Sequence, residues 1–276
     1  MVKNLNSLER NFSIAVLDSG FGGLTVLSPL RRLLPRERII YLGDTARLPY
    51  GDKSRETIRA YAAESARFLI DQDVKLLIVA CHTASTAALD YLRETLSIPV
   101  IGISEQGIEE LALRPHLRRV AILGTRATIA SGVYQKQLRE RLPAVEVTAV
   151  ACSLFVPLVE EGYLDHPMTT LAVKEYLRPL RKKQMQALLL GCTHYPLLEP
   201  LMRREMGDAV QLIDPGFRCA QTAQKLLSEK ELLSDEKTAG DCTFFVTDDP
   251  EKFRRIGERF LGCPIENVYQ AMGIST

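Results

Sequence analysis

The sequence predicts an α/β protein built from two pseudo-symmetric α/β domains with mainly parallel sheets and an active site in the cleft between them. Short apolar runs rich in β-branched residues alternate with amphipathic stretches of helical length, which is typical of parallel sheets covered by helices. The stretch SIAVLDSGFGGLTVL from Ser13 resembles RVAILGTRATIASGV from Arg119, so the chain contains an internal repeat. In the same way IVACHTAS (78–85) resembles LLLGCTHY (188–195), and both contain a cysteine directly after the apolar run.

The predicted strands are nearly continuous apolar runs, as expected for strands buried on both faces. They cover residues 13–17, 38–42, 75–80, 98–103, 119–123, 145–150, 186–191 and 209–213. One intervening stretch, residues 54–72, places Ile58, Ala62 and Leu69 on a single face, which predicts an amphipathic helix. Another helix is expected from Pro250, because Asp249 is placed to cap it and proline suits the first helical position.

The repeat divides the chain into two domains of similar construction. We expect the first to comprise residues 1–104 together with 214–276, and the second to comprise residues 105–213. The tail after Asp214 is too short for a third comparable domain. Its apolar runs at 243–246 and 266–271 predict two further strands, so the tail is expected to pack back on the first domain.

Charge and composition exclude several classes of function. The 276 residues carry a net charge of +1, from 35 basic and 34 acidic residues, so no overall field favours nucleic acid or an acidic membrane. No apolar run reaches the length of a membrane span, and the first residues lack a signal peptide's apolar core. We therefore expect a cytoplasmic protein with no nucleic-acid or membrane partner, in which the six cysteines stay reduced.

Polar side chains follow several predicted strands, at the edge of a parallel sheet where ligands bind. A free cysteine is usually an inert core residue, but the repeat makes Cys81 and Cys192 equivalent, which favours two thiols facing each other across a domain cleft. A zinc site is the alternative, although its ligands would have adjacent and i, i+2 spacings unlike those of known zinc motifs. These ligands would be Cys81, His82, Cys192 and His194.

Two glycine-containing loops also follow predicted strands. The first, DSGFGG from Asp18, matches neither the Walker pattern nor a complete GxGxxG, but its amides at a helix N-terminus suit a carboxylate. The second, GDTARLPYG, is a polar loop constrained by Pro49 and Gly51. No lysine lies at a strand end within these motifs, so a pyridoxal cofactor is not indicated and no cofactor is expected.

Together, DSGFGGLTV, GDTARLPYG, ACHTAS, CSLFVPLVEEG and LGCTHYPLL resemble the glutamate racemases of the aspartate/glutamate racemase superfamily. The resemblance runs from about Ile14 to Asp214 and is more specific than any single motif. It implies two α/β domains that each contribute one cysteine to a shared active site. It also implies cofactor-independent interconversion of L- and D-glutamate, which supplies D-glutamate for peptidoglycan.

Carried over to this chain, the resemblance makes Cys81 and Cys192 the acid/base thiols. A cysteine near its reference pKa of about 8.5 is mostly protonated at neutral pH, so nearby groups must help to remove its proton. Asp18 and His194 are the candidates for this help, on the Cys81 and Cys192 sides respectively. The resemblance places the following residues around the substrate: Asp18, Ser19, Pro49, Tyr50, Gly51, His82, Thr83, Thr125, Thr193 and His194. His82 stands where the family usually has asparagine, which adds a group expected to titrate near 6.5 beside Cys81.

Inversion at Cα needs a base on one face of the substrate and an acid on the other. Because two negative charges in one pocket are disfavoured, the resting pair is expected to hold one thiolate and one thiol. An aspartate racemase or related enzyme of the superfamily is an alternative. From other classes, a Cys/His metal-dependent hydrolase and a non-catalytic amino-acid-binding protein also fit. The resemblance further allows a homodimer and activation by a cell-wall precursor.

Overall fold

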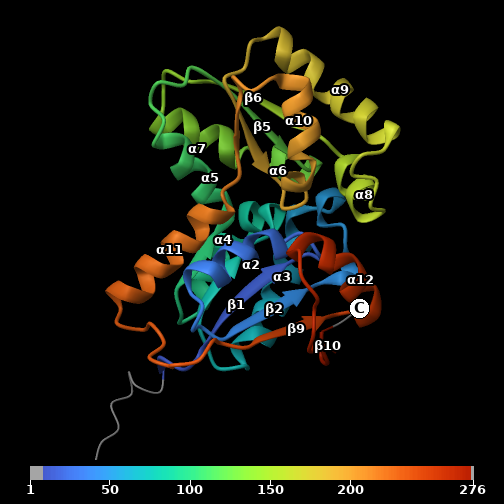
Figure 1. Cartoon of the computed structure of the whole chain (residues 1–276). Coiled ribbons are helices and arrows are strands. Elements are labelled where there is room, and N and C mark those ends of the chain that lie inside the picture. Colours follow the sequence, from blue (N-terminus) through green and yellow to red (C-terminus); the bar gives the residue numbers. More distant parts are fainter. Residues whose placement is uncertain (1–8, 275–276) are drawn as a thin grey trace, which may run out of the picture.

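Two parallel β-sheets, one in each of two lobes, form the framework of the computed structural model, which describes residues 9–274 (Figure 1). Residues 1–8 and 275–276 lie outside the described part, so the expectation for the first residues of the chain is not addressed. Within residues 9–274, no helix combines the length and apolar character needed to cross a bilayer.

The six-stranded sheet has the order β10-β9-β2-β1-β3-β4, and each neighbouring pair is parallel. Its strands are β1 (Ser13–Asp18), β2 (Ile39–Gly43), β3 (Val74–Val79), β4 (Val100–Gly102), β9 (Cys242–Val246) and β10 (Val268–Gln270). The tail of the chain therefore extends the first sheet by two strands, as predicted.

The four-stranded sheet has the order β6-β5-β7-β8 and is also parallel throughout. Its strands are β5 (Arg119–Gly124), β6 (Glu146–Ala151), β7 (Ala187–Gly191) and β8 (Gln211–Ile213). The four strands β2-β1-β3-β4 of the first sheet have the same order, so β1, β2, β3 and β4 correspond to β5, β6, β7 and β8. The internal repeat is thus a repeat of topology, and Cys81 and Cys192 follow the third strand of their respective halves.

Helices cover both faces of each sheet. In the first lobe, α2 (Leu24–Leu33), α11 (Gly216–Glu229) and α12 (Pro250–Leu261) pack on the face that carries Ile14 and Val16, while α3 (Arg55–Ile70) and α4 (His82–Thr95) pack on the other. In the second lobe, one face is covered by α5 (Ile103–Ala112) and α7 (Val133–Arg141), and the other by α8 (Phe155–Glu160), α9 (Pro167–Lys182) and α10 (Glu199–Met206).

Short helices build the loops at the carboxyl ends of the strands. They are η1 (Thr45–Arg47), η2 (Tyr50–Asp52), α6 (Arg126–Ala130) and η3 (Tyr195–Leu198). The chain passes between the lobes before α5 and again before α11, and these two helices pack together beside the junction (Figure 1). One apolar cluster continues from the first lobe into the second, so the lobes share part of their core.

The fold class predicted from the sequence is confirmed, and so are the two helices predicted from local signals. Helix α3 begins after Ser54, whose side chain accepts a hydrogen bond from the amide of Thr57, and α12 is capped by Asp249 through the amide of Lys252. We propose domain boundaries of 1–104 with 214–276 and of 105–213, because each set of residues supplies all the strands of one sheet.

Candidate active site

A small cavity of about 30 Å³ lies between the lobes at the carboxyl ends of the strands. The first lobe lines it from the turn after β1, the loop around η2 and the start of α4. The second lobe lines it from the residues after β5 and β7 and from α8. The lining residues are Ser19, Gly20, Leu48, Pro49, Tyr50, Gly51, Cys81, His82, Thr83, Thr125, Val156, Glu160, Cys192, Thr193 and His194. Of the site residues predicted from sequence, only Asp18 is not among them.

Cys81 lies between the end of β3 and the first turn of α4, where its backbone takes the N-cap position. Its Sγ is 3.4 Å from the Oγ of Ser19, the residue that follows β1. The amide of Ala84, in the first turn of α4, favours the thiolate of Cys81. A helix N-terminus and a neighbouring hydroxyl are both suited to stabilise a thiolate formed during turnover.

Cys192 is the first member of a chain of three polar groups in the second lobe. The Nδ1 of His194 lies 3.9 Å from the Cys192 Sγ, and the Nε2 of the same ring lies 2.9 Å from Oε1 of Glu160. A proton on Nε2 directed at the Glu160 carboxylate leaves Nδ1 as an acceptor facing the thiol. The arrangement suits removal of a proton from Cys192 by His194, with Glu160 stabilising the resulting imidazolium.

Burial raises the pKa of both thiols. The pKa of Cys81 is raised to about 11, mainly by loss of water and further by the charge of Asp18. The pKa of Cys192 is raised well above its ordinary value, again mainly by burial. The expectation of one resting thiolate is therefore wrong for this structure: desolvation outweighs the favourable contacts, and both groups are neutral thiols at pH 7.

Asp18 lies under the cavity floor, at the end of β1. Its Oδ2 accepts a hydrogen bond of 2.9 Å from the amide of Gly20, whereas its buried Oδ1 has no hydrogen-bond partner among the described residues. Burial raises the pKa of Asp18, while the nearby charge of His194 opposes the shift. Asp18 is thus coupled electrostatically to both sides of the site, to Cys81 as well as to His194.

Hydroxyl groups from both lobes gather beside the thiols. The Thr83 Oγ1 lies 2.9 Å from the Oγ1 of Thr125 and 3.0 Å from that of Thr128. Thr193 lies beside the turn after β1, since its carbonyl accepts a hydrogen bond from the Thr25 hydroxyl. The hydroxyls of Thr83, Thr125 and Thr193 are neutral donors of the kind that bind a carboxylate.

The loop around η2 forms the opposite wall. The Tyr50 hydroxyl donates to Asp44, so the phenol oxygen is directed away from the cavity and the ring supplies the surface. Gly51 is required by a close approach between the lobes, because a Cβ there would lie 2.7 Å from the Cβ of Thr125. Pro49 also lines the cavity on this side.

His82 lines the cavity, but its ring is held by the second lobe. Its Nδ1 lies 2.5 Å from the hydroxyl of Tyr134 in α7, and the residue is only 3% exposed. Burial lowers the pKa of His82 to about 3. The expectation that His82 titrates near 6.5 is therefore wrong, because the buried imidazole has no acidic partner to offset the cost of a charge.

Sequence reasoning missed Glu160 and Tyr134. Glu160 lies within CSLFVPLVEEG, one of the motifs that carried the resemblance, but nothing local distinguishes it from the neighbouring Glu161. The structure distinguishes them, since Glu160 faces His194 and Glu161 is exposed. Tyr134 belongs to helix α7 and lies in none of the motifs described above. No local pattern therefore indicates its contact with His82, which depends on tertiary packing.

A wider cavity of about 230 Å³ adjoins the site and opens it toward solvent. It shares Leu48, Pro49, Gly51, Thr125, Val156 and Glu160 with the inner cavity and adds Asp52, Arg126, Ser153 and Pro157. Arg126 of the second lobe donates to Asp52 of the first across a distance of 2.8 Å. This exposed ion pair lines the wider cavity, which is the expected entrance to the site.

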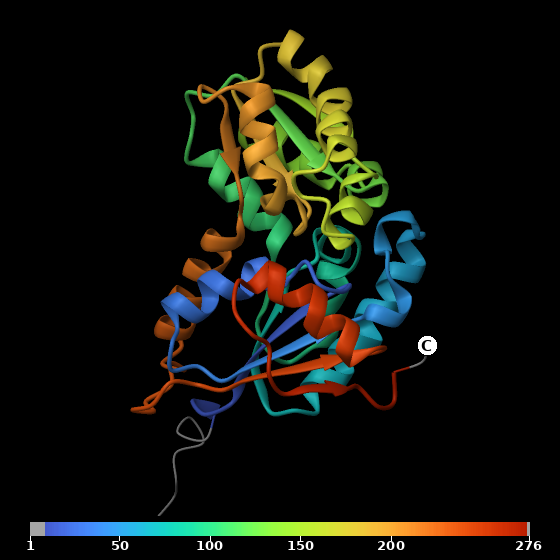
Figure 2. The same cartoon turned by 45° about the vertical axis from the view of Figure 1, so that its right-hand side comes forward.

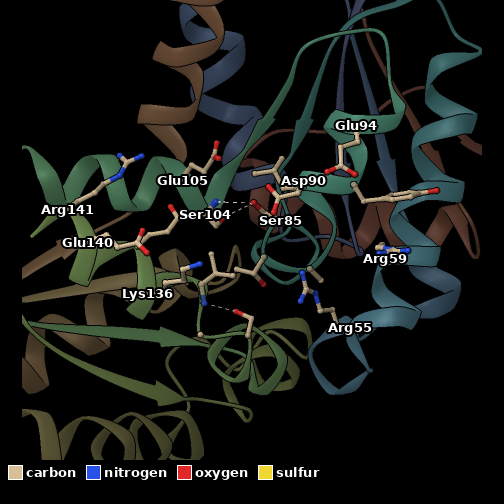
Figure 3. A pocket seen from close by; sticks show the side chains of 18 residues that line it. Arg55, Arg59, Ser85, Asp90, Glu94, Ser104, Glu105, Lys136, Glu140 and Arg141 are labelled. Carbon is tan, nitrogen blue, oxygen red and sulfur yellow. Dashed lines mark hydrogen bonds between the residues drawn. The ribbon is translucent and has the colours of Figure 1, made fainter.

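The largest cavity described, about 660 Å³, lies elsewhere at the junction of the lobes, over α4, α5 and α7 (Figure 3). Figure 3 shows arginine, lysine and carboxylate side chains around it, together with a hydrogen bond between Ser85 and Ser104. The two serine oxygens are 2.7 Å apart. Four basic and four acidic side chains line it: Arg55, Arg59, Lys136, Arg141, Asp90, Glu94, Glu105 and Glu140. This balanced charge gives no preference for an anion, and no thiol lines the cavity.

The four groups suggested for a zinc site, Cys81, His82, Cys192 and His194, line one cavity but are not arranged as metal ligands. Across residues 9–274, no three His, Cys, Asp or Glu side chains are grouped so that they could hold a metal ion. The imidazole of His82 faces Tyr134, and that of His194 faces Glu160.

Comparison with known proteins agrees with this arrangement. The model of the Asp/Glu/Hydantoin racemase family matches residues 25–222. A glutamate racemase of Geobacter metallireducens is 46% identical over 258 residues, which are 94% of this chain and 96% of that protein. The crystal structure of a Francisella tularensis glutamate racemase in complex with D-glutamate is 42% identical. It has a TM-score of 0.89, covering 95% of this chain and 97% of that one.

A solved structure of lower sequence identity contains a regulatory ligand. The Escherichia coli glutamate racemase is 28% identical to this chain, with a TM-score of 0.78, and the match covers 95% of this chain and 98% of that protein's chain. It was solved in complex with L-glutamate and the activator UDP-MurNAc-ala. From the family match and the near full-length similarity, this chain belongs to the Asp/Glu/Hydantoin racemase family and, within it, to the glutamate racemases.

Proposed function

We propose that this protein interconverts L- and D-glutamate with Cys81 and Cys192 as the two acid/base groups. The observation that carries the proposal is the placement of the two thiols: they follow topologically equivalent strands and line one cavity from opposite lobes. A substrate held between them presents one face of Cα to each sulfur. No external cofactor is required for a proton to leave one face and another to arrive on the opposite face.

The residues around Cys192 account for formation of a thiolate from a neutral thiol. His194 accepts the Cys192 proton at Nδ1, and the charge of Glu160 stabilises the imidazolium. The thiolate then removes the α-proton of one enantiomer, and the Cys81 thiol donates its proton to the other face. The Cys81 thiolate that remains is stabilised by Ser19 and by the amide of Ala84 until a proton returns.

In this proposal the substrate's carboxylates are bound by uncharged donors. Ser19, Thr83, Thr125 and Thr193 offer hydroxyls, and the glycine turn after β1 and the start of α4 offer amides. His82 keeps a neutral ring against this surface and contributes shape and one hydrogen-bonding nitrogen. Glutamate is favoured over aspartate because the relatives that match over nearly the full chain are glutamate racemases.

Circular dichroism of L-glutamate incubated with the purified protein and no cofactor tests the function. We expect the signal to decay to zero as the racemate forms, and either Cys81→Ser or Cys192→Ser to abolish this decay while substrate binding persists. Cys152→Ser is the matched control, because the Cys152 thiol is buried outside the cavity. Full activity in either of the first two variants would contradict the two-thiol mechanism. Loss of activity on chelation, restored by zinc, would favour the metal alternative.

The cellular setting of this activity is also proposed. A cytoplasmic location suits two thiols that must stay reduced, and the family's role is to supply D-glutamate for peptidoglycan. The activator of the Escherichia coli relative makes a cell-wall precursor a candidate regulator here, which a comparison of turnover with and without UDP-MurNAc-Ala tests. A homodimer stays a prediction, checked by light scattering of the purified protein.

A further inference from the structure

Helix α12 belongs to the tail of the chain, and its middle is fixed to the first lobe. Its Phe253 ring lies 5.8 Å from Phe21 and 5.7 Å from Tyr41, measured between ring centroids. The Tyr41 hydroxyl donates to the carbonyl of Gly20, in the turn that begins the cavity floor. Figures 1 and 2 show α12 lying along the first lobe with one end directed to the junction of the lobes.

The last turn of α12 contacts the second lobe at its catalytic groups. The Phe260 ring meets the His194 imidazole edge to face, with centroids 5.1 Å apart and planes at 83°. The Arg259 Nη1 donates to the carbonyl of Glu160 at 3.2 Å. Gly162 leaves room for this guanidinium, since a Cβ there would lie 2.3 Å from the same Nη1. Neither Arg259 nor Phe260 lines the cavity.

These contacts determine the surroundings of the His194–Glu160 pair. Phe260 is 7% exposed and covers the imidazole with apolar surface, and an ion pair shielded from water is stronger than a hydrated one. From the same lobe, Gly22 packs closely on His194: a Cβ there would lie 2.6 Å from Nδ1. The ring is therefore held between two elements of the opposite lobe, with one nitrogen toward Glu160 and the other toward Cys192.

We propose that Phe260 and Arg259 are positioning residues that hold His194 and Glu160 in the geometry needed to deprotonate Cys192. This inference rests on the proposed role of Cys192 as one of two bases. It makes the Cys192 half of the reaction dependent on a helix of the Cys81 lobe.

Kinetic isotope effects on the two directions test the inference. By family resemblance, Cys192 deprotonates L-glutamate and Cys81 deprotonates D-glutamate. In Phe260→Ala we expect kcat to fall roughly tenfold with KM little changed, because a small displacement of a catalytic group is costly. The α-deuterium effect on kcat/KM should rise for L-glutamate and fall for D-glutamate, because the Cys192 step becomes rate-limiting. Phe260→Leu, which keeps the apolar cover, should recover part of the rate.

Matched variants on the same helix separate positioning from packing. Ile256→Ala removes a buried side chain one turn earlier and should leave the ratio of the two isotope effects at its wild-type value. Arg259→Gln, at an exposed position, should change that ratio in the same direction as Phe260→Ala, while Arg255→Gln, also at an exposed position, should not. An unchanged ratio in both Phe260→Ala and Arg259→Gln overturns the inference, as does an equal change in Ile256→Ala. An active Cys192→Ser protein would instead overturn the proposed mechanism itself.

Discussion

Burial, more than any neighbouring charge, governs the state of the two thiols. With the Cys81 pKa raised to about 11, the reactive thiolate is rare at pH 7 and grows as pH rises toward 11. We predict that iodoacetamide labels Cys81 slowly at pH 7 and about tenfold faster for each unit of pH up to about 10. Mass spectrometry of the peptides measures this, with the exposed Cys263 as an internal control. Rapid labelling of Cys81 at pH 7 would show that the thiol is already ionised.

Glu160 is predicted to act through its charge. Glu160→Gln keeps an acceptor for the Nε2 proton of His194 but removes the charge that stabilises the imidazolium, so kcat should fall by roughly a hundredfold while KM changes little. Steady-state kinetics with both enantiomers measure the effect. Glu161→Gln, at the exposed neighbouring position, is the control and should keep wild-type kinetics.

His82 is predicted to make the free energy of unfolding sensitive to acid. It is not expected to contribute a titration to the pH dependence of activity. The pKa of His82 is about 3 in the folded protein, below the value of about 6.5 in the unfolded chain. Below pH 6.5 the unfolded chain binds a proton that the folded protein does not, so the free energy of unfolding decreases as pH falls from 6.5 toward 3. Between pH 6.5 and 5, urea unfolding should show a loss of about 2 kcal/mol in the wild type that is absent in His82→Asn. Equal acid sensitivity of the two proteins would mean that His82 is not held neutral.

Among the short elements, η2 and α6 face each other across the entrance, and their charges are opposite in sign. The substrate is an anion, so we predict that Arg126→Gln lowers kcat/KM and Asp52→Asn raises it. Both effects should shrink as salt is added, because the two side chains are exposed and screened. Stopped-flow or steady-state measurements over a range of ionic strength provide the test. Changes of the same sign in both variants would point to disrupted packing at the entrance.

Most elements could be predicted from sequence because their signals are local. Largely apolar runs indicated the strands found between residues 9 and 274, although those for β6 and β10 contain polar residues, and Ser54 and Asp249 mark helix starts by side-chain capping. The prediction for β4 was too long, since 98–103 includes Pro99, which cannot donate to a ladder, and Ile103, which begins α5. Glu160 and Phe260 could not be assigned to the site, because their roles depend on contacts with His194 across 34 and 66 positions of sequence.

At the scale of the whole molecule, the repeat was the most informative feature of the sequence. It predicted that two thiols would meet between two lobes, and the structure places both on the same cavity. What the repeat could not indicate was the protonation state of the pair, because the exclusion of water arises only when both lobes close on the site. Cys81 and Cys192 are only 5% and 6% exposed, so both thiols have lost most of their contact with water.

The two halves match in strand order, but only the first carries the added β9, β10 and α12. L- and D-glutamate are mirror images with equal free energy in water, so kcat/KM must be the same in both directions whatever asymmetry the protein contains. The asymmetry between the halves can therefore make kcat and KM differ between the two enantiomers, but it cannot make kcat/KM differ. A substitution in α12 that speeds saturated turnover of one enantiomer more than the other must weaken apparent binding of that enantiomer in the same proportion.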